Sequence, residues 1–331
     1  MASRKLLVLD LNGTLLLRSK HARSAARSSS GPRPRSVYPR PYLPAFREYI
    51  FSSDTMQWLD VMVWSSAQPA SVADMVHHSF GEQQRKLTAI WARDTLGLPP
   101  ELYHKKTATT KDLARTWATF PAHDARTTVL LDDSARKAHR HPHNHVCVRE
   151  YSADARRRDL AVWRAADMAV GKSKVLQAPD SGASPPAAAD APPPWVLASQ
   201  TYDETLLAVV GILDALKTQT DVADWIRSGG LLGVNTGDEQ AAHPSDRKSR
   251  PPSPSTDADA LQPDLRHQLA ALSLSSAPDP AAAAWFDSEA VVRYWVGQGR
   301  LALAALQIDV VAGIHSDAPE QKPGTRTRAE K

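Results

Sequence analysis

The chain has 331 residues and a formal net charge of +4, a length that allows roughly two domains. Its single cysteine, Cys147, excludes an internal disulfide and fits a reducing compartment. No run reaches the roughly 18 apolar residues of a membrane-spanning helix, and the first predicted strand begins near Arg4, too early to follow a cleaved presequence. We therefore expect a protein of the nucleus or cytoplasm without a membrane segment.

Strand and helix patterns alternate through the first half of the chain. Short apolar runs predict buried strands, and amphipathic segments between them predict helices. The predicted strands cover residues 5–9, 61–66, 127–134 and 145–151, and the predicted helices cover residues 44–54, 69–80 and 111–117. Between residues 86 and 94, Leu87, Ile90 and Trp91 form a further apolar pattern. This alternation predicts an α/β fold, a Rossmannoid parallel sheet with helices on both faces.

The rest of the chain divides by composition. Residues 177–194 are dominated by Pro and Ala, and residues 236–283 are polar and rich in Pro and Ser, so neither segment can build a core. Helical patterns return between these segments and after them. We expect their apolar faces to pack back on the first domain or, for the second helix, to bind a partner. The predicted divisions are an α/β domain at 1–176, a linker at 177–194, a helical extension at 195–235, a disordered segment at 236–283, a C-terminal helix at 284–315 and a disordered tail at 316–331.

Polar side chains follow three of the predicted strands. Asp10 follows the first strand, Ser65 ends the second, and Asp132 and Asp133 end the third. Because the carboxyl ends of parallel strands lie at one edge of a sheet, where ligands bind, we expect these side chains to share one small cleft. An Asp at the end of a buried strand is well placed to act as a nucleophile or metal ligand.

Five short motifs stand in order along this part of the chain. They are Asp10-Leu-Asn12-Gly-Thr14, Arg40-Pro41 before PAFREYIF, Trp64-Ser65-Ser66-Ala67, TTKDL with Lys111, and LLDDSARKAHRHPHNH with Asp132 and Asp133. Together they resemble the haloacid dehalogenase superfamily and, within it, the NLI-interacting-factor family, which includes phosphatases of the RNA polymerase II C-terminal domain. The resemblance covers roughly residues 4–170, and its last motif is the most specific.

The resemblance implies a site that transfers a phosphoryl group with the help of Mg²⁺. Asp10 would attack the phosphorus and form an aspartyl phosphate. Asp10, the backbone carbonyl of Asn12 and Asp133 would be the protein ligands of Mg²⁺, which prefers oxygen donors. Asp132 would lie behind them and orient Lys111.

The resemblance also implies how the phosphate is held. Thr14 and Ser65 would donate hydrogen bonds, and Ser65, Ser66 and Lys111 would bind the phosphoryl oxygens. The implied substrate is a phosphorylated protein or peptide.

Asn12 is the point at which the sequence departs from the family. There a second Asp protonates the leaving oxygen and then activates water, whereas an amide has no pKa that allows either step. The carboxamide can still hydrogen-bond a leaving oxygen. We therefore expect impaired turnover of alkyl phosphates, or else a catalytically inactive phosphopeptide-binding adaptor or receptor. A relative in the mitochondrial import translocase uses its phosphatase-like domain as a receptor.

Several patterns allow a second interpretation. Lys105 or Lys106 could take the place of Lys111, and the paired Asp residues could be a helix N-cap with a solvated neighbour. His residues at every second position from 139 to 145 could bind Zn²⁺ on a regular strand, but Pro142 interrupts such a strand.

Basic and aromatic residues raise the question of a macromolecular partner. Residues 18–40 contain seven Lys or Arg and no acidic residue, so this loop is either a solvated spacer or a docking site for an acidic or phosphorylated partner or for nucleic acid. Most tryptophans lie beside Leu, Ile or Val in amphipathic patterns. This placement favours core packing over base stacking, so we do not expect a nucleic-acid partner.

Overall fold

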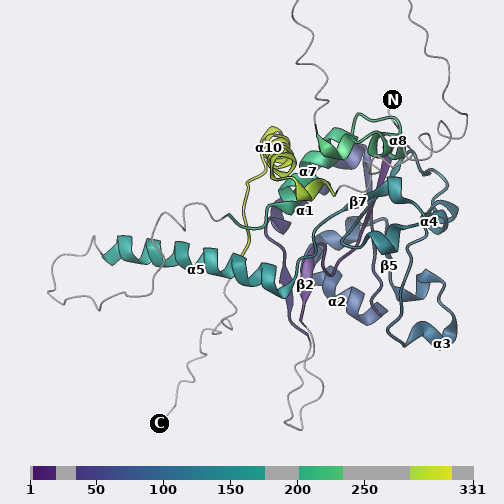
Figure 1. The fold of residues 1–331 in the computed structure, drawn as a ribbon, viewed down its shortest axis with the longest axis horizontal. Coiled ribbons are helices and arrows are strands. Elements are labelled where there is room, and N and C mark those ends of the chain that lie inside the picture. Colours follow the sequence, from purple (N-terminus) through teal and green to yellow (C-terminus); the bar gives the residue numbers. More distant parts are fainter. Residues whose placement is uncertain (1–2, 20–34, 176–200, 234–283, 315–331) are drawn as a thin grey trace, which may run out of the picture.

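The computed structural model describes residues 3–19, 35–175, 201–233 and 284–314 (Figure 1). The centre of this described part is a five-stranded parallel sheet in the order β5-β4-β1-β6-β7. The first strand of the chain lies at its middle, and every residue of that strand is buried. The strands of the sheet are β1 (Lys5–Leu9), β4 (Leu59–Trp64), β5 (Ala89–Trp91), β6 (Thr128–Asp132) and β7 (His145–Cys147).

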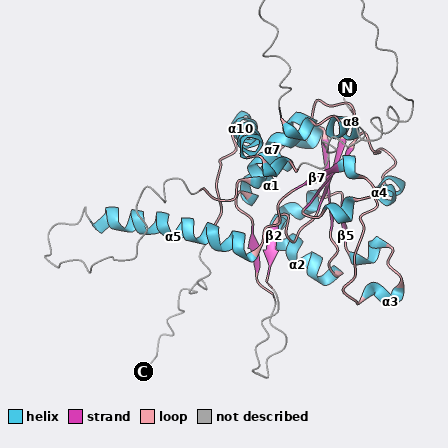
Figure 2. Cartoon of the chain, in the orientation of Figure 1, coloured by secondary structure: helices cyan, strands magenta, loops and turns pink. Residues whose placement is uncertain are grey.

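Helices join these strands and continue after them (Figure 2). The α-helices are α1 (Leu43–Ile50), α2 (Pro69–Phe80), α3 (Pro100–Tyr103), α4 (Leu113–Thr119), α5 (Ala153–Val175), α7 (Thr205–Leu216), α8 (Val222–Arg227) and α10 (Glu289–Ala305). Short 3₁₀ helices are η1 (Thr55–Gln57), η2 (Gly81–Lys86), η3 (Arg93–Leu96), η4 (Ala135–Ala138), η5 (Pro142–Asn144), η6 (Gly230–Leu232) and η7 (Trp285–Asp287). An antiparallel pair, β2 (Leu16–Arg18) and β3 (Val37–Pro39), lies outside the sheet.

Both faces of the sheet are covered by apolar side chains. Successive residues of β1 alternate between the faces, so Leu7 and Leu9 join one core and Leu6 and Val8 join the other. The larger core contains the apolar sides of α1, α2 and α7, and the smaller one contains Leu113 of α4. The predicted α/β class, a parallel sheet with helices, is confirmed.

The helices α7 and α10 pack closely against each other. A Cβ atom built at Gly299 of α10 would lie 1.9 Å from the carbonyl oxygen of Leu207 on α7, so the two backbones meet where side chains are absent. The sequence predicts one apolar face for α7, whereas all residues from Leu206 to Leu213 are buried. The reason is that α7 lies between α1 and α10 and is covered on more than one side.

Differences from the predicted elements are small in the sheet and larger outside it. The strand predicted at 61–66 begins two residues earlier, at Leu59, and the one predicted at 145–151 ends at Cys147. The pair β2–β3 is not predicted from the sequence. The helix α5 projects away from the rest of the molecule (Figure 1). None of the helices described here is long and apolar enough to cross a membrane.

Some predictions fall on residues outside the described ranges. They are the linker at 177–194, residues 195–200 and 234–235 of the helical extension, the disordered segment at 236–283, the tail at 316–331 and residues 20–34 of the basic loop.

Candidate functional site

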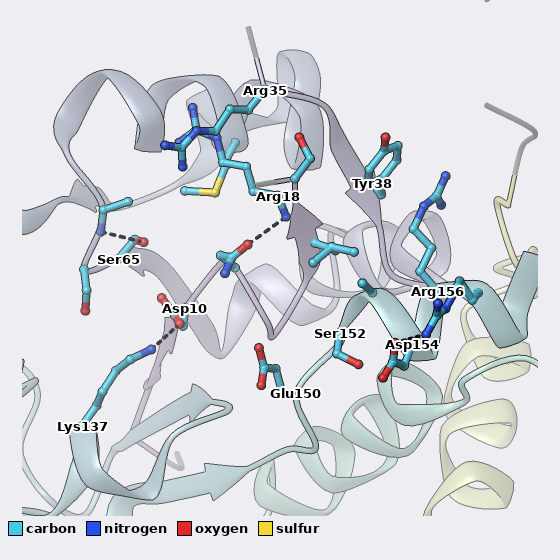
Figure 3. Close-up of a pocket in the computed structure, with 18 of the residues that line it drawn as sticks. Asp10, Arg18, Arg35, Tyr38, Ser65, Lys137, Glu150, Ser152, Asp154 and Arg156 are labelled. Atoms are coloured by element: carbon cyan, nitrogen blue, oxygen red, sulfur yellow. Dashed lines mark hydrogen bonds and ion pairs between the residues drawn. The ribbon is translucent and has the colours of Figure 1, made fainter. Parts of the chain in front are cut away.

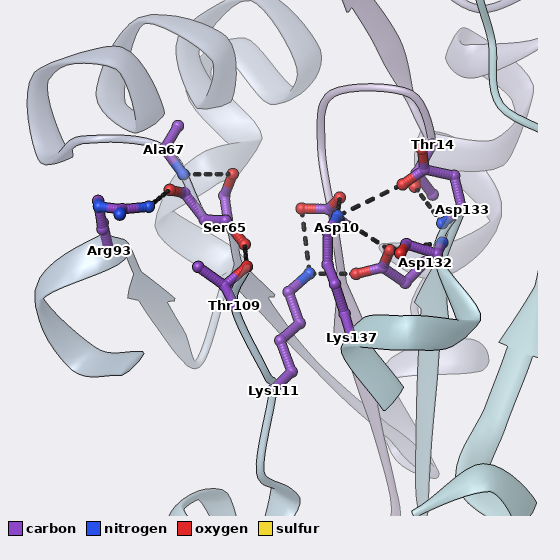
Figure 4. Close-up of polar contacts among 12 residues, drawn as sticks. Asp10, Thr14, Ser65, Ala67, Arg93, Thr109, Lys111, Asp132, Asp133 and Lys137 are labelled. Atoms are coloured by element: carbon purple, nitrogen blue, oxygen red, sulfur yellow. Dashed lines mark hydrogen bonds and ion pairs between the residues drawn. The ribbon is translucent and has the colours of Figure 1, made fainter. Parts of the chain in front are cut away.

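The carboxyl ends of three neighbouring strands bring the predicted side chains together (Figure 4). Asp10 follows β1, Ser65 follows β4 on one side of it, and Asp132 ends β6 on the other side. Carboxylate oxygens of Asp10, Asp132 and Asp133 lie within 4.8 Å of one another. The predicted convergence of the carboxylates at one edge of the sheet is therefore observed.

A tight loop after β1 fits closely against the end of β6. Gly13 has a φ of +90°, and a Cβ atom built there would lie 2.5 Å from Oδ2 of Asp133. Only glycine allows both this conformation and this approach. The backbone N–H of Asp133 donates to Oγ1 of Thr14 at 3.1 Å, which ties the two strand ends together.

Lys111 lies beneath the carboxylates. It belongs to the extended segment before α4, whose N-cap is Asp112, and it is fully buried. Its Nζ lies 2.6 Å from Oδ2 of Asp132 and 3.0 Å from Oδ1 of Asp10. In the described part of the chain neither Lys105 nor Lys106 forms an ion pair, so the structure brings Lys111 to the carboxylates.

Lys137 is a second lysine of the site, and the sequence analysis misses it. Its Nζ lies 2.8 Å from Oδ2 of Asp10, 3.0 Å from Oδ1 of Asp132 and 3.4 Å from Oδ1 of Asp133. The turn η4 directly after β6 carries it back over the strand end. A basic residue four positions after Asp133 is the signal that could have identified it, because one helical turn makes such residues neighbours.

Burial and charge shift the pKa values in this cluster. Burial alone would lower the pKa of Lys137, but the charges of Asp10, Asp132 and Asp133 outweigh it and hold that pKa above its ordinary range. Burial raises the pKa of Asp133 to about 7, with Lys137 opposing and the two other carboxylates adding to the rise. Burial also opposes ionisation of Asp132, yet both lysines hold its pKa below the ordinary range.

The donor atoms fit a hard divalent cation, because carboxylate oxygens are the ligands that Mg²⁺ prefers. Both oxygens of Asp132 are engaged: Oδ1 accepts from the N–H of Ser134 at 2.9 Å and contacts Lys137, and Oδ2 contacts Lys111. Both oxygens of Asp10 also contact a lysine, Oδ1 with Lys111 and Oδ2 with Lys137, whereas the ion pair of Asp133 involves Oδ1 with Lys137. Among the residues that the structure describes, this is the one group of three or more His, Cys, Asp or Glu side chains close enough to hold a metal.

Two serines follow β4 next to Asp10. Ser65 is buried, and its Oγ accepts from the N–H of Ala67 at 3.4 Å, which leaves its O–H free to donate. Oγ of Ser66 and Oγ1 of Thr109 are 2.9 Å apart. Both serines line the same cleft as Asp10.

Asn12 is exposed at this cleft, beside the buried Asp10. Its Oδ1 accepts from the backbone N–H of Arg18 at 2.8 Å (Figure 3). This bond orients the amide so that its NH₂ group is available to the cleft.

The cleft has a volume of about 1070 Å³ and an arginine-rich wall (Figure 3). Arg18, Arg35, Arg156 and Arg157 line it, together with Glu150 and Asp154. Burial and then the positive charge of Arg35 lower the pKa of Arg18, so two guanidinium groups repel each other at the rim.

Arg40 corrects the prediction for the basic loop, because it is not part of a free cationic surface. Its side chain is fully buried, with Nη2 2.8 Å from Oδ2 of Asp203. Its Nη1 donates to the carbonyl of Thr14 at 3.0 Å. Arg40 thus links the loop after β1 to the segment that enters α7.

The histidine run has structural partners. His141 contacts Asp112 at 3.0 Å, and Nε2 of His145 lies 3.0 Å from the carbonyl oxygen of Asp132. The amide of Asn144 donates to the carbonyls of Ala125 and Thr128. His145 thus contacts the carboxyl end of β6, and Asn144 contacts its first residue. Pro142 begins the turn η5, where a regular strand would be needed to align the histidines.

Comparison with known proteins agrees with this geometry. Residues 5–165 match the family model described as NLI interacting factor-like phosphatase. An uncharacterized FCP1 homology domain-containing protein of Schizosaccharomyces pombe is 36% identical over 161 residues, which are 46% of this chain and 63% of that protein. Residues 5–165 are therefore similar in sequence to the NLI interacting factor-like phosphatase family, as the sequence motifs predict.

Two solved structures are also similar to this chain. One is a variant of the fission yeast RNA polymerase II CTD phosphatase Fcp1 bound to beryllium fluoride, with a TM-score of 0.31, 17% identity, and coverage of 45% of this chain and 42% of that one. The other is described as Fcp1, an essential RNA polymerase II CTD phosphatase, with a TM-score of 0.34, 14% identity, and coverage of 69% and 71%.

Proposed function

We propose that this chain is a Mg²⁺-dependent protein phosphatase-like domain with Asp10 as its nucleophile and with impaired turnover of phosphoserine and phosphothreonine. One observation carries the proposal. The buried carboxylate of Asp10, paired with Lys111, stands at the floor of a cleft in which the neighbouring exposed side chain is Asn12.

Each residue has a role that its contacts support. Lys111 and Asp132 hold Asp10 in one orientation, and Ser65 and Ser66 have hydroxyl groups on the same cleft for the phosphoryl oxygens. When bound by Asp10, Asp133 and the Asn12 carbonyl, Mg²⁺ would neutralise charge on the phosphoryl group. Phosphoryl transfer depends mainly on such positioning and charge.

Asn12 limits the chemistry because its amide cannot exchange a proton with the leaving oxygen or with water near neutral pH. General acid–base catalysis is worth about 10² to 10⁴ in rate. An alkyl leaving group, as in phosphoserine, depends on this help, whereas an aryl leaving group needs it little.

Asn12→Asp tests the proposal. In the full chain with Mg²⁺ we expect it to raise turnover of a phosphoserine peptide by about 10² or more, and turnover of p-nitrophenyl phosphate by less. Asp10→Asn should abolish turnover of both substrates. Asn12→Ala is the matched control, because it removes the amide without adding an acid, and it should bring no gain.

A second candidate is a phosphopeptide-binding adaptor on the same site. It is favoured by the amide of Asn12, which is held by the Arg18 backbone and can donate to a phosphate without moving a proton. The arginine wall gives this site its anionic preference, and an acidic or phosphorylated partner for residues 18–40 stays a prediction. Two results together would favour the adaptor. The chain would bind a phosphopeptide, measured by fluorescence anisotropy, and a folded Asn12→Asp variant would show no gain in turnover on either substrate.

A further inference from the structure

The ammonium group of Lys137 touches all three carboxylates of the cluster. It lies nearest to Asp10 and Asp132, at 2.8 and 3.0 Å, and 3.4 Å from Asp133. A cation in this position bridges the oxygens that a divalent metal ion would use. Lys111 contacts Asp10 and Asp132 but has no ion pair with Asp133 in the described part of the chain.

The two lysines differ in their freedom to move. Lys111 is fully buried between its partners, whereas the side chain of Lys137 is 20% exposed and lines the large cleft. The backbone of Lys137 is fixed at both ends, since its N–H donates to the Ser134 carbonyl and its carbonyl accepts from the N–H of Lys111. The side chain can therefore leave the carboxylates for the cleft without movement of the chain.

We propose that Lys137 is an internal competitor of the divalent cation: its ammonium holds the place between Asp10 and Asp133 and must turn into the cleft before the cation binds. The inference rests on the metal site of the proposed function. It adds that Lys137 occupies this site when the divalent cation is absent. Lys137 leaves the site as the concentration of the cation rises.

The physical reason is charge. Three carboxylates already face two ammonium groups, and a divalent ion added with Lys137 in place would lie within a few ångströms of a like charge. Both oxygens of Asp10 are also occupied without the divalent ion, Oδ1 by Lys111 and Oδ2 by Lys137. Displacement of Lys137 frees Oδ2 of Asp10 for the cation.

Binding of Mn²⁺, followed by electron paramagnetic resonance on the full chain without substrate, tests the proposal. Lys137→Met keeps the side-chain length and removes the charge, and we expect it to bind Mn²⁺ at least tenfold more tightly than the wild type. Lys106→Met is the matched control, because Lys106 lines the same cleft without an ion pair in the described residues, and it should leave the affinity within twofold. Asp133→Asn, combined with Lys137→Met, should remove the tight binding and so assign it to this cluster.

Thermal unfolding gives a second measurement that does not depend on activity. Without a divalent ion, Lys137→Met should melt below the wild type, because three carboxylates lose a cation, and Mg²⁺ should raise its melting temperature more than that of the wild type. Lys137→Gln serves the same test if the Met variant does not fold.

Two outcomes overturn the inference and separate it from the proposed function. If the wild type and Lys137→Met bind Mn²⁺ equally, or the variant binds more weakly, Lys137 is not a competitor while the metal site stands. If neither binds Mn²⁺ at this cluster, the metal site of the proposed function falls, and the inference falls with it.

Discussion

At the scale of single residues, the site depends on a glycine as much as on its charged groups. Gly13 brings the loop after β1 against Asp133, with a φ that disfavours any side chain. Its carbonyl accepts from the N–H of Tyr151 at 2.7 Å, so the backbone at this position is held from two sides. An added methyl group would meet the Asp133 carboxylate, which would have to turn away from its place in the cluster.

Gly13→Ala should therefore disturb both stability and the site. We expect a loss of more than about 2 kcal/mol in the free energy of unfolding, the sum of left-handed strain and a clash with Asp133, and weaker binding of Mn²⁺. Gly229→Ala is the control, because Gly229 has a left-handed φ of +84° but its added Cβ would meet only Cδ1 of Leu232, at 3.8 Å. That variant should lose only about 1 to 2 kcal/mol, measured by urea denaturation, and should keep its metal affinity. Equal losses in the two variants would mean that the contact with Asp133 is unimportant.

The sequence predicts Asp10, Ser65 and Asp132 at one edge because each follows an apolar run, and parallel strands place their ends together. It does not predict Lys137. The residue reaches the cluster only through the turn η4, whose geometry depends on contacts such as the bond from Lys111 to the Lys137 carbonyl. The burial of Arg40 is missed for a similar reason, since its partner Asp203 is 163 positions away in the sequence.

At the scale of elements, the sequence predicts best where burial is complete. The predicted bounds of β1 agree with the observed ones, because all five of its residues are buried and its sequence, KLLVL, is an apolar run after Lys5. The strands β2 and β3 have three residues each and are separated by a long segment, so no periodicity identifies them. The burial of α7 on several sides is missed because it depends on α10, which follows much later in the chain.

The close contact between α7 and α10 predicts that an alanine at Gly299 destabilises the protein. Gly299→Ala places a methyl group within 1.9 Å of the Leu207 carbonyl, so the helices must separate. We expect a loss of about 2 to 4 kcal/mol in the free energy of unfolding, since an overpacked backbone contact has no flexible neighbour that can yield.

Gly297 of the same helix provides the control. Nothing lies within 4 Å of a Cβ atom built there, and alanine is a better helix former by about 1 kcal/mol. Gly297→Ala should therefore raise the midpoint of urea denaturation slightly. If Gly299→Ala also raised this midpoint, the inference that α7 and α10 approach closely at Gly299 would be wrong.

At the scale of the whole molecule, one buried ion pair connects the later helices to the site. Nη2 of Arg40 forms an ion pair with Asp203, and Nη1 donates a hydrogen bond to the Thr14 carbonyl. The segment entering α7 is therefore part of the support of the loop that bears Asn12 and Thr14. Burial opposes ionisation of Asp203, but the charge and hydrogen bonds of Arg40 lower its pKa below the ordinary value.

This lowered pKa gives stability a definite dependence on pH. The ionised Asp203 carboxylate contributes to the free energy of unfolding above the unfolded-state pKa of about 3.9. This contribution is lost as the pH falls through the lower folded-state pKa. Asp203→Asn should therefore cost about 3 kcal/mol at pH 7, because it leaves the buried guanidinium of Arg40 without the opposite charge of its ion pair. The difference from the wild type should begin to shrink below a pH of about 4, since a proton then binds Asp203 in the unfolded state, and in the folded state only at lower pH.

Urea denaturation of the full chain at several pH values measures this difference. The control is Asp287→Asn, because Asp287 is 69% exposed in its ion pair with Arg149 and should contribute less than about 1 kcal/mol at any pH. Binding of a phosphopeptide or Mn²⁺ should weaken in Asp203→Asn at pH 7, even though Asp203 does not line the cleft, because the Thr14 carbonyl loses a fixed donor. A cost that is equal at pH 7 and pH 3.5 would show that Asp203 acts through packing, and the link from the C-terminal helices to the site would then not be electrostatic.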